Sequence, residues 1–248
     1  ESSDAVFRDC LFCGNAAAAF AGALEIGGGA PSFRNCLIVD NHSGSDGGGI
    51  YVRGGAPVWD NCVVMRNVAG SRGGGIRTTG GNSLLRNSIV WGNVAQKGSQ
   101  IYATASIVLR YCDVANGAGD YGGLLQMIDD GDGCIHADPK VVCAEAGIYR
   151  LDHTSPCIDA GNANCLPGEL TTDYLGGVRL VGANVDIGAF EHQGIIFVDA
   201  NGGDDTNSGL SWSEAKRTLS AALDAAHDGW VVLVAAGTYR GPQNRGLD

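Results

Sequence analysis

The chain has 248 residues, a formal net charge of −11 and 44% hydrophobic residues. Nucleic acids and anionic membranes need basic residues at their phosphates, so the charge argues against both partners, and the hydrophobic content argues against disorder. No apolar run reaches the ~18–20 residues that span a bilayer, and an acidic surface poor in lysine suits a secreted protein.

Residues 1–116 repeat themselves every 26 residues. The 40 glycines, well above the usual share of about 7%, follow this repeat and not the Gly-X-Y period of collagen. Segments 32–41 and 58–67 are near copies, each with two short apolar runs separated by asparagine, a pattern typical of strands joined by turns. One column holds Asn15, Asn41, Asn67 and Asn93, and another holds Cys10, Cys36, Cys62, Ser88 and Cys112.

One such unit cannot bury its apolar face alone, whereas stacked units pair their strands at about 4.8 Å per coil. We therefore predict an all-β fold, a right-handed parallel β-helix of roughly 26-residue coils, over residues 1–116. A leucine-rich repeat would need a leucine consensus, and a propeller blade needs ~40 residues. Two columns are expected inside the helix: Phe7, Phe33, Trp59, Leu85 and Leu109, and Phe12, Ile38, Val64, Val90 and Val114.

The bends of each coil are marked by asparagine and glycine. Asn35, Asn61 and Asn87 recur at one bend, where we expect a ladder in which each amide bonds the copies above and below. Glycine triplets at 47–49 and 73–75 recur at another bend, where positive φ angles are expected. The cysteine column is expected to pack inward as small core residues, and one Cys-x-x-Cys pair at residues 10–13 does not make a zinc knuckle.

Beyond residue 116 the period is lost, and we expect an irregular closing module at residues 117–193. It contains the phrases Ser155-Pro-Cys-Ile-Asp-Ala-Gly161 and Asp186-Ile-Gly-Ala-Phe-Glu191. These phrases resemble the C-terminal end of bacterial pectin-lyase-like β-helix surface proteins of the choice-of-anchor Q domain type. The resemblance covers about residues 1–193 and implies a secreted or surface-attached protein. It implies no single activity, because the fold hosts lyases, hydrolases, adhesins and scaffolds.

Residues 194–248 predict a strand-helix-strand module. Residues 195–199 form the first strand, and the capping-box pair Ser211 and Glu214 opens an amphipathic helix that Gly229 ends. Residues 231–234 form the second strand. The module is similar to the opening of a pectin-lyase-like β-helix, in which a helix caps the first coil.

This order, coils first and an opening module last, predicts assembly with copies of the chain or with neighbouring β-helix domains, head to tail. The apolar helix face needs a partner surface, and the first coil is open to strand addition. Such a contact is heterologous, so repetition gives a ring or a fibre. The expected interface comprises Val6, Phe7, Phe12, Leu219, Leu223, Val231, Val232, Leu233 and Val234.

Three groups of residues are candidates for ligand binding or chemistry. Polysaccharide lyases of this fold use a Lys or Arg base beside an acidic, often calcium-bearing groove. Glycoside hydrolases need two carboxylates at a fixed separation, and clustered acids are also candidate calcium ligands, although neither acidic set has EF-hand spacing. The candidate glycan contacts are Arg8, Arg34, Arg86 and Arg110. The candidate calcium ligands are Asp129, Asp130 and Asp132, and Asp199, Asp204 and Asp205.

No catalytic constellation is recognisable, and calcium is the one candidate cofactor. The leading hypothesis is a non-catalytic extracellular scaffold or adhesive surface module that assembles end to end into a fibre or tandem array. The alternatives are a carbohydrate-active enzyme of the polysaccharide lyase kind and a β-helix that binds glycans without turnover. Cys157 with Cys165, and Cys134 with Cys143, are candidate disulfides in an exported protein.

Overall fold

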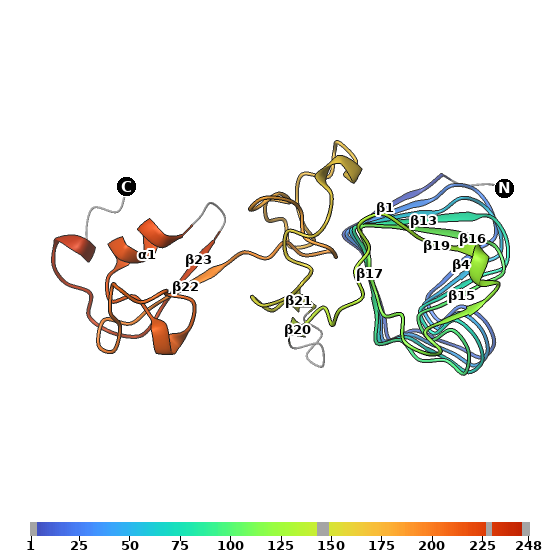
Figure 1. Ribbon diagram of the computed structural model, residues 1–248, viewed down its shortest axis with the longest axis horizontal. Coiled ribbons are helices and arrows are strands. Elements are labelled where there is room, and N and C mark those ends of the chain that lie inside the picture. The colour runs from blue at the N-terminus through green and yellow to red at the C-terminus, as the bar shows by residue number, and fades with distance from the viewer. Residues whose placement is uncertain (1–3, 143–148, 227–229, 245–248) are drawn as a thin grey trace. The chain divides into compact units, whose positions relative to one another are not determined.

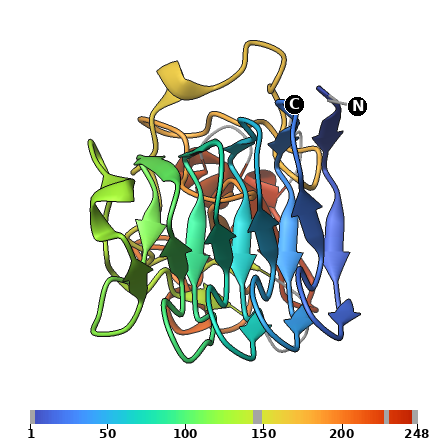
Figure 2. The same ribbon diagram turned by 90° about the vertical axis from the view of Figure 1, so that its right-hand side faces the viewer.

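The computed structural model describes residues 4–142, 149–226 and 230–244. The chain divides into two compact units, residues 1–191 and residues 192–248. The larger unit contains the stacked coils, seen along their axis in Figure 1 and from the side in Figure 2. The sequence placed the second boundary at residues 193 and 194, two residues from the division in the structure.

Parallel strands from successive coils form four sheets in the larger unit. Sheet A consists of β1 (Val6–Arg8), β5 (Ser32–Arg34), β9 (Val58–Asp60), β13 (Asn82–Arg86), β16 (Ser106–Arg110) and β19 (Ile128–Asp130). Sheet B consists of β2 (Leu11–Cys13), β6 (Leu37–Val39), β10 (Val63–Met65), β14 (Ile89–Trp91) and β17 (Asp113–Val114). Sheet C consists of β3 (Ala16–Ala17), β7 (His42–Ser43) and β11 (Val68–Ala69). Sheet D consists of β4 (Leu24–Ile26), β8 (Ile50–Val52), β12 (Ile76–Thr78), β15 (Ile101–Ala103) and β18 (Tyr121–Gly123).

The two inward columns predicted from the sequence are confirmed. In sheet A, Phe7 pairs with Phe33, Phe33 with Trp59, and the column continues through Leu85 to Leu109. The rings of Phe33 and Trp59 stack with their centroids 5.8 Å apart. The second column follows sheet B in the same register. Both columns lie in one continuous core, which buries Cys36, Cys62 and Cys112 as the sequence indicated.

The asparagine ladder was predicted at the wrong column. The side chains that bond to one another are Asn15, Asn41, Asn67 and Asn93, where each Nδ2 donates to the next Oδ1 at 2.9 Å and the last donates to Gln100. Asn35, Asn61 and Asn87 do occupy a tight bend, with φ of 49°, 52° and 48°. A left-handed residue at this corner turns its side chain out of the coil, where it bonds residues between Asn162 and Asp186. Within the column itself, Asn35 donates to Asp9 at 2.9 Å, but no asparagine of the column bonds another.

The glycine triplets are required for two reasons, a positive φ at one position and a lack of space for a Cβ at another. Gly47 and Gly73 have the expected positive φ, 69° and 65°. Gly48 and Gly74 lie where a Cβ would run into a backbone carbonyl of the next coil, so their lack of a side chain permits the close stacking.

The coils continue beyond residue 116, where the sequence predicted that they end. β18 and β19 extend sheets D and A, and Asp113 forms a parallel bridge with Ile135. The last coil is shorter and contains the 3-10 helix η1 (Leu125–Met127), so its residues do not follow the 26-residue interval of the other coils. Because the backbone pairing persists while the interval changes, sequence periodicity alone stopped one coil early.

The remainder of the larger unit, residues 137–191, is here called the closing segment. It contains an antiparallel pair, β20 (Val141–Val142) with β21 (Arg150–Leu151), and the 3-10 helix η3 (Ala163–Cys165). Its apolar side chains cover the outer face of sheet B and form a second core. That core joins the sheet residues Leu37, Val39, Val63, Met65 and Ile89 to the closing-segment residues Tyr149, Leu151, Cys157, Ile187, Ala189 and Phe190.

The smaller unit pairs β22 (Ile195–Val198) in parallel with β23 (Val231–Val234). Ser211 caps the 3-10 helix η4 (Trp212–Glu214), whereas the α-helix α1 (Leu219–Ala225) begins after a second cap, Thr218. The predicted single helix from Ser211 is therefore two short ones, and Gly229 lies outside the described residues. A final 3-10 helix, η5, spans Pro242–Asn244.

The apolar face of α1 was expected to lack a partner, and this was wrong. Ala222 is fully buried against Ile196 and Val198 of the same unit, and Leu219 packs on that cluster. Leu223 is 48% exposed, as are Val231, Leu233 and Val234 to a similar degree.

Candidate functional site

The predicted arginine stripe runs along the outer face of sheet A. Arg8, Arg34, Arg86 and Arg110 occupy one register position, with Asp60 in the third place. Asp60 is 1% exposed and accepts from Nε and Nη2 of Arg86 at 2.6 and 3.0 Å. Burial raises the pKa of Asp60, and the arginine contact opposes that shift. Asp60 therefore gives Arg86 a partner within its own face.

The other arginines of the stripe also have partners in the chain. Arg110 bonds Asp129 at 2.7 Å, and this contact lowers the pKa of the carboxyl. Arg34 forms an ion pair with Glu169 of the closing segment. Arg8 donates to the Glu169 carbonyl, and its Nε lies 3.2 Å from Oδ2 of Asp9. The stripe is thus neutralised by carboxylates of the same unit and partly covered by its closing segment.

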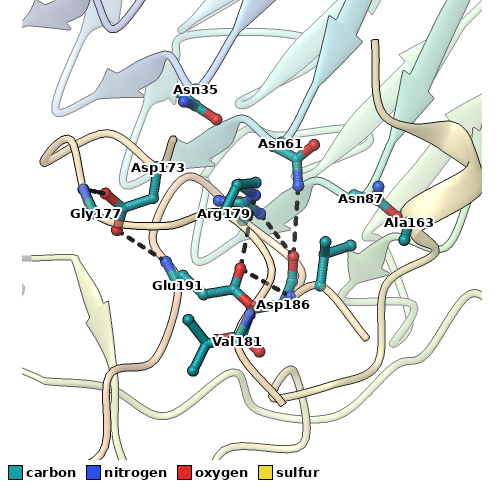
Figure 3. A network of polar contacts seen from close by, with 12 residues as sticks. Asn35, Asn61, Asn87, Ala163, Asp173, Gly177, Arg179, Val181, Asp186 and Glu191 are labelled. Atoms are coloured by element: carbon teal, nitrogen blue, oxygen red, sulfur yellow. Dashed lines mark hydrogen bonds and ion pairs between the residues drawn. The ribbon is translucent and has the colours of Figure 1, made fainter. Parts of the chain in front are cut away.

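Figure 3 shows a buried polar network at the contact between the closing segment and the coils. Arg179 is 1% exposed, and its Nη2 donates to the carbonyls of Asp186 and Gly188 at 2.9 and 2.8 Å. Its Nε lies 3.7 Å from Oε2 of Glu191. Burial, and after it repulsion from the Asp186 carboxylate, raises the pKa of Glu191 to about 8. Desolvation lowers the pKa of Arg179.

The same network holds three turns of the closing segment in place. Glu191 accepts from the amides of Val181 and Asp186, both at 3.2 Å, and its own amide donates to Asp173. The second oxygen of Asp173 accepts from Gly177 at 2.8 Å. Nε and Nη1 of Arg179 make no hydrogen bond within the described residues, whereas the carboxylates of Glu191 and Asp173 accept from backbone amides, so the network orders the segment.

The family model described as a right-handed β-helix region matches residues 1–155, which is more than half of the chain. The chain belongs to the right-handed β-helix family. No curated protein and no solved structure matches it. Among the described residues of this β-helix, no helix is long and apolar enough to cross a membrane.

A thiol and a carboxylate meet beneath the closing segment of the β-helix. Sγ of Cys157 donates to Oδ2 of Asp113 at 3.0 Å, and both side chains are buried. Burial raises the pKa of Asp113 to about 6 and also raises the pKa of Cys157. A thiol held protonated in this way is a poor nucleophile. Cys157 and Cys165 are both free, so the disulfide considered for them is absent, and Cys143 lies outside the described residues.

The acidic residues proposed for calcium do not converge. Residues 4–142, 149–226 and 230–244 contain no group of three His, Cys, Asp or Glu side chains placed to hold a metal. Asp129 pairs with Arg110, while Asp130 accepts from the Tyr121 hydroxyl at 2.8 Å on the inner side of the same strand. Asp132 contributes its carbonyl to the Tyr111 amide.

The second acidic set stabilises loops of the smaller unit. Asp199 accepts from the Asn201 amide, and Asp204 from Thr206, each at 2.9 Å. Asp205 accepts from the amides of residues 217 and 218, both at 2.8 Å, which fixes the approach to α1. These carboxylates act as turn acceptors.

The outer face of sheet D holds a column of side chains that none of the predicted sites includes. Its outward column runs Glu25, Tyr51, Arg77, Tyr102 and Gly122 in continuous parallel register. The available signal was the middle residue of each three-residue strand, which must face outward when its two neighbours face the core. This column places the buried Arg77 between Tyr51 and Tyr102, an arrangement that none of the predicted sites has.

Proposed function

We propose that this β-helix is a non-catalytic structural and adhesive module of an extracellular surface protein. The observation that carries the proposal is the pairing of the sheet A arginines with Asp60, Asp129 and Glu169. A lyase needs a basic side chain that is free to take a proton beside its acidic groove. The arginines that the sequence offered as glycan contacts are instead paired with carboxylates of the chain itself.

The surface location rests on the resemblance of two phrases to choice-of-anchor Q proteins. Residues 155–161 and 186–191 contribute Cys157, Asp186 and Glu191 to the second core and the buried network. Their strong sequence signature therefore has a structural reason in this chain, since it fastens the closing segment to the coils.

End-to-end assembly stays a prediction. β1 and β2 lie at the edges of their sheets, and Val6 and Leu11 are more than half exposed there. Phe7 and Phe12 of the predicted interface are partly buried against the core. Light scattering over a range of protein concentrations is expected to show mass that grows with concentration, and Val6→Lys is expected to suppress that growth. A constant monomer mass would contradict assembly of this chain with itself.

The proposal is tested most simply as a lack of turnover. Polygalacturonate, alginate and other uronate-containing glycans are incubated with the protein, with and without calcium, and the ultraviolet absorbance of new unsaturated ends is followed. We expect no increase over a heat-inactivated control. A reproducible increase in absorbance that Arg34→Ala or Arg110→Ala abolishes would show that the chain is a lyase.

A further inference from the structure

Five cysteines and one serine occupy equivalent positions on successive coils. The backbone fixes their register, because the residue after each member donates its amide to the carbonyl of the member on the preceding coil, at 2.8–3.0 Å. Ser88 separates the last two cysteines of this column from the first three. The column runs Cys10, Cys36, Cys62, Ser88, Cys112 and Cys134.

The local hydrogen bond at this position does not require a cysteine. Sγ of Cys112 donates to the carbonyl of Arg110, two residues earlier, at 3.3 Å. Oγ of Ser88 donates to the equivalent carbonyl of Arg86 at 2.8 Å, and Ser88 is fully buried in the same column. Because a hydroxyl fills the position and makes the shorter bond, the recurrence of sulfur has another cause.

Cys112 and Cys134 have the spacing of a disulfide. Cys112 lies between β16 and β17, and Cys134 directly precedes Ile135, whose parallel bridge to Asp113 sets the register. Equivalent residues on neighbouring coils are about 4.8 Å apart, inside the range of roughly 4.4–6.8 Å over which disulfides join Cα atoms. Both side chains belong to the same core cluster, and both thiols are free. One bond between them would tie the last coil to the coil before it.

The two thiols differ in exposure and in acidity. Cys112 is fully buried, whereas Cys134 is half-buried and follows the exposed Gly133. The contact with Cys112 lowers the pKa of Cys134, and burial raises the pKa of Cys112. The thiolate is the attacking species in disulfide exchange. Cys134 is therefore the residue that an external oxidant reaches first.

We propose that Cys112 and Cys134 form a disulfide between the last two coils by exchange with an external disulfide, such as glutathione disulfide. The thiolate of Cys134 attacks one sulfur of the oxidant and releases the first glutathione. The thiolate of Cys112 then attacks Sγ of Cys134 and releases the second. The chain loses two electrons and two protons, and the oxidant gains them as two thiols. The inference concerns the core alone and is independent of whether the module is catalytic.

The disulfide would act where the regular coils end. Cys134 lies just before the closing segment, in the one coil that departs from the 26-residue interval. A bond across residues 112–134 removes conformations from the unfolded chain, which stabilises the fold. For a unit of this size, oxidation is expected to raise the melting temperature by about 5–10 °C.

The other cysteines of the column do not define one pairing. Cys36 has a cysteine on the coil before it and another on the coil after it, so register alone permits a bond to Cys10 or to Cys62. Cys112 has Ser88 on one side and Cys134 on the other. The isolated pair therefore has a single partner assignment within the column.

Peptide mapping tests this bond directly. Trypsin is expected to release residues 111–140 as one peptide, which contains Cys112, Met127 and Cys134 and no other cysteine. The whole chain is reduced, incubated with glutathione disulfide, blocked with iodoacetamide and digested. Cleavage of the peptide after Met127 with cyanogen bromide is expected to leave two fragments that stay joined until a reductant is added.

Two serine variants separate this bond from other thiol chemistry. Cys134→Ser places in the column a residue that Ser88 shows to fit. It is expected to lose the joined fragments and to show a smaller rise in melting temperature on oxidation than the wild type. Cys165→Ser removes a half-buried thiol of the closing segment and is expected to keep both properties. The mapping is read on the wild type, so it decides the question whether or not a variant folds.

Joined fragments in the wild type and in Cys165→Ser support the inference. Full alkylation of Cys112 and Cys134, under conditions that oxidise the exposed Cys13, overturns it. A stable glutathione adduct at Cys134, with Cys112 alkylated, overturns the pairing. A bond from Cys134 to Cys143, or to any other cysteine outside residues 111–140, overturns it as well. None of these results bears on the turnover of glycans, which the absorbance assay tests separately.

Discussion

Sheets B and D are built by the same repeat and bury the same kind of inward column, yet their outer faces differ. The outward residues of sheet B, such as Leu37, Val63 and Ile89, are apolar and covered by the closing segment. Those of sheet D, such as Tyr51 and Tyr102, are aromatic or charged and half-buried. In a solenoid the inward positions specify the fold, whereas the outward positions specify what each face does.

The first way to sharpen this comparison is a change in the core that lies behind both sheets. Trp59→Ala opens a cavity in the inward column between Phe33 and Leu85 and is expected to cost about 3–5 kcal/mol in the free energy of unfolding. Arg53→Ala, an exposed control just after β8 whose partner is Glu25, is expected to leave the urea midpoint nearly unchanged. Similar midpoint shifts for the two variants would mean that the inward and outward columns are misassigned.

The second prediction separates the closing segment from the coils. Arg179→Ala leaves Glu191 buried without its partner, and breaking a buried ion pair in this way is expected to cost about 3 kcal/mol in the free energy of unfolding. This is the lower end of the range, because the raised pKa of Glu191 lets the carboxylate take up a proton and lose its charge. Hydrogen exchange is expected to accelerate at residues 157–191 while the amides of sheets A and D stay protected. Uniform acceleration across the coils would contradict the view of the segment as a separate cover.

The third prediction uses pH. Asp113 has its pKa raised to about 6 by burial, so the folded state holds this proton more tightly than the unfolded state does. Its contribution to stability is therefore lost as pH rises from about 4 to about 6, by up to about 3 kcal/mol. Asp113→Asn is expected to gain that much relative to wild type between about pH 4 and about pH 7. Parallel stability curves in urea for the two proteins would refute the assignment.

The fourth prediction concerns the true asparagine ladder. Asn67 accepts from the amide and the side chain of Asn41 and donates to Asn93 and to the Ile38 carbonyl. Asn67→Ala strands these buried groups and is expected to cost about 2 kcal/mol. Asn35→Ala, at the corner column, is the comparison and is expected to cost less in the coils while it loosens the segment at Thr172. A larger loss of stability in urea for Asn35→Ala than for Asn67→Ala would mean that the corner column forms the stabilising ladder.

The sequence predicted the core columns, whose positions the 26-residue repeat determines. It did not predict which side chains turn outward or how the non-repeating closing segment folds. Phe33 and Trp59 could be placed because a 26-residue interval stacks equivalent residues. Two asparagine columns share that interval, so periodicity could not tell which one faces its copies and which one turns outward. Arg179 and Glu191 lie outside any repeat, and their pairing depends on a fold of the segment that no period describes.

One signal for the second core was present and unused. Residues 37–39, 63–65 and 89–91 are each three consecutive apolar residues, a pattern that indicates a strand buried on both faces. The strands of sheet D alternate instead, with a polar or aromatic residue in the middle. That contrast was sufficient to predict that sheet B is covered.

Hydroxyl-radical footprinting with mass spectrometry tests the contrast between the faces most directly, because the chain has only two methionines. Met65 faces outward on sheet B beneath the closing segment and is 6% exposed, whereas Met127 in η1 is partly exposed. The account predicts slow oxidation of Met65, faster oxidation of Met127, and modification of Tyr51 and Tyr102 on sheet D. Oxidation of Met65 as fast as that of Met127, with both tyrosines protected, would contradict it.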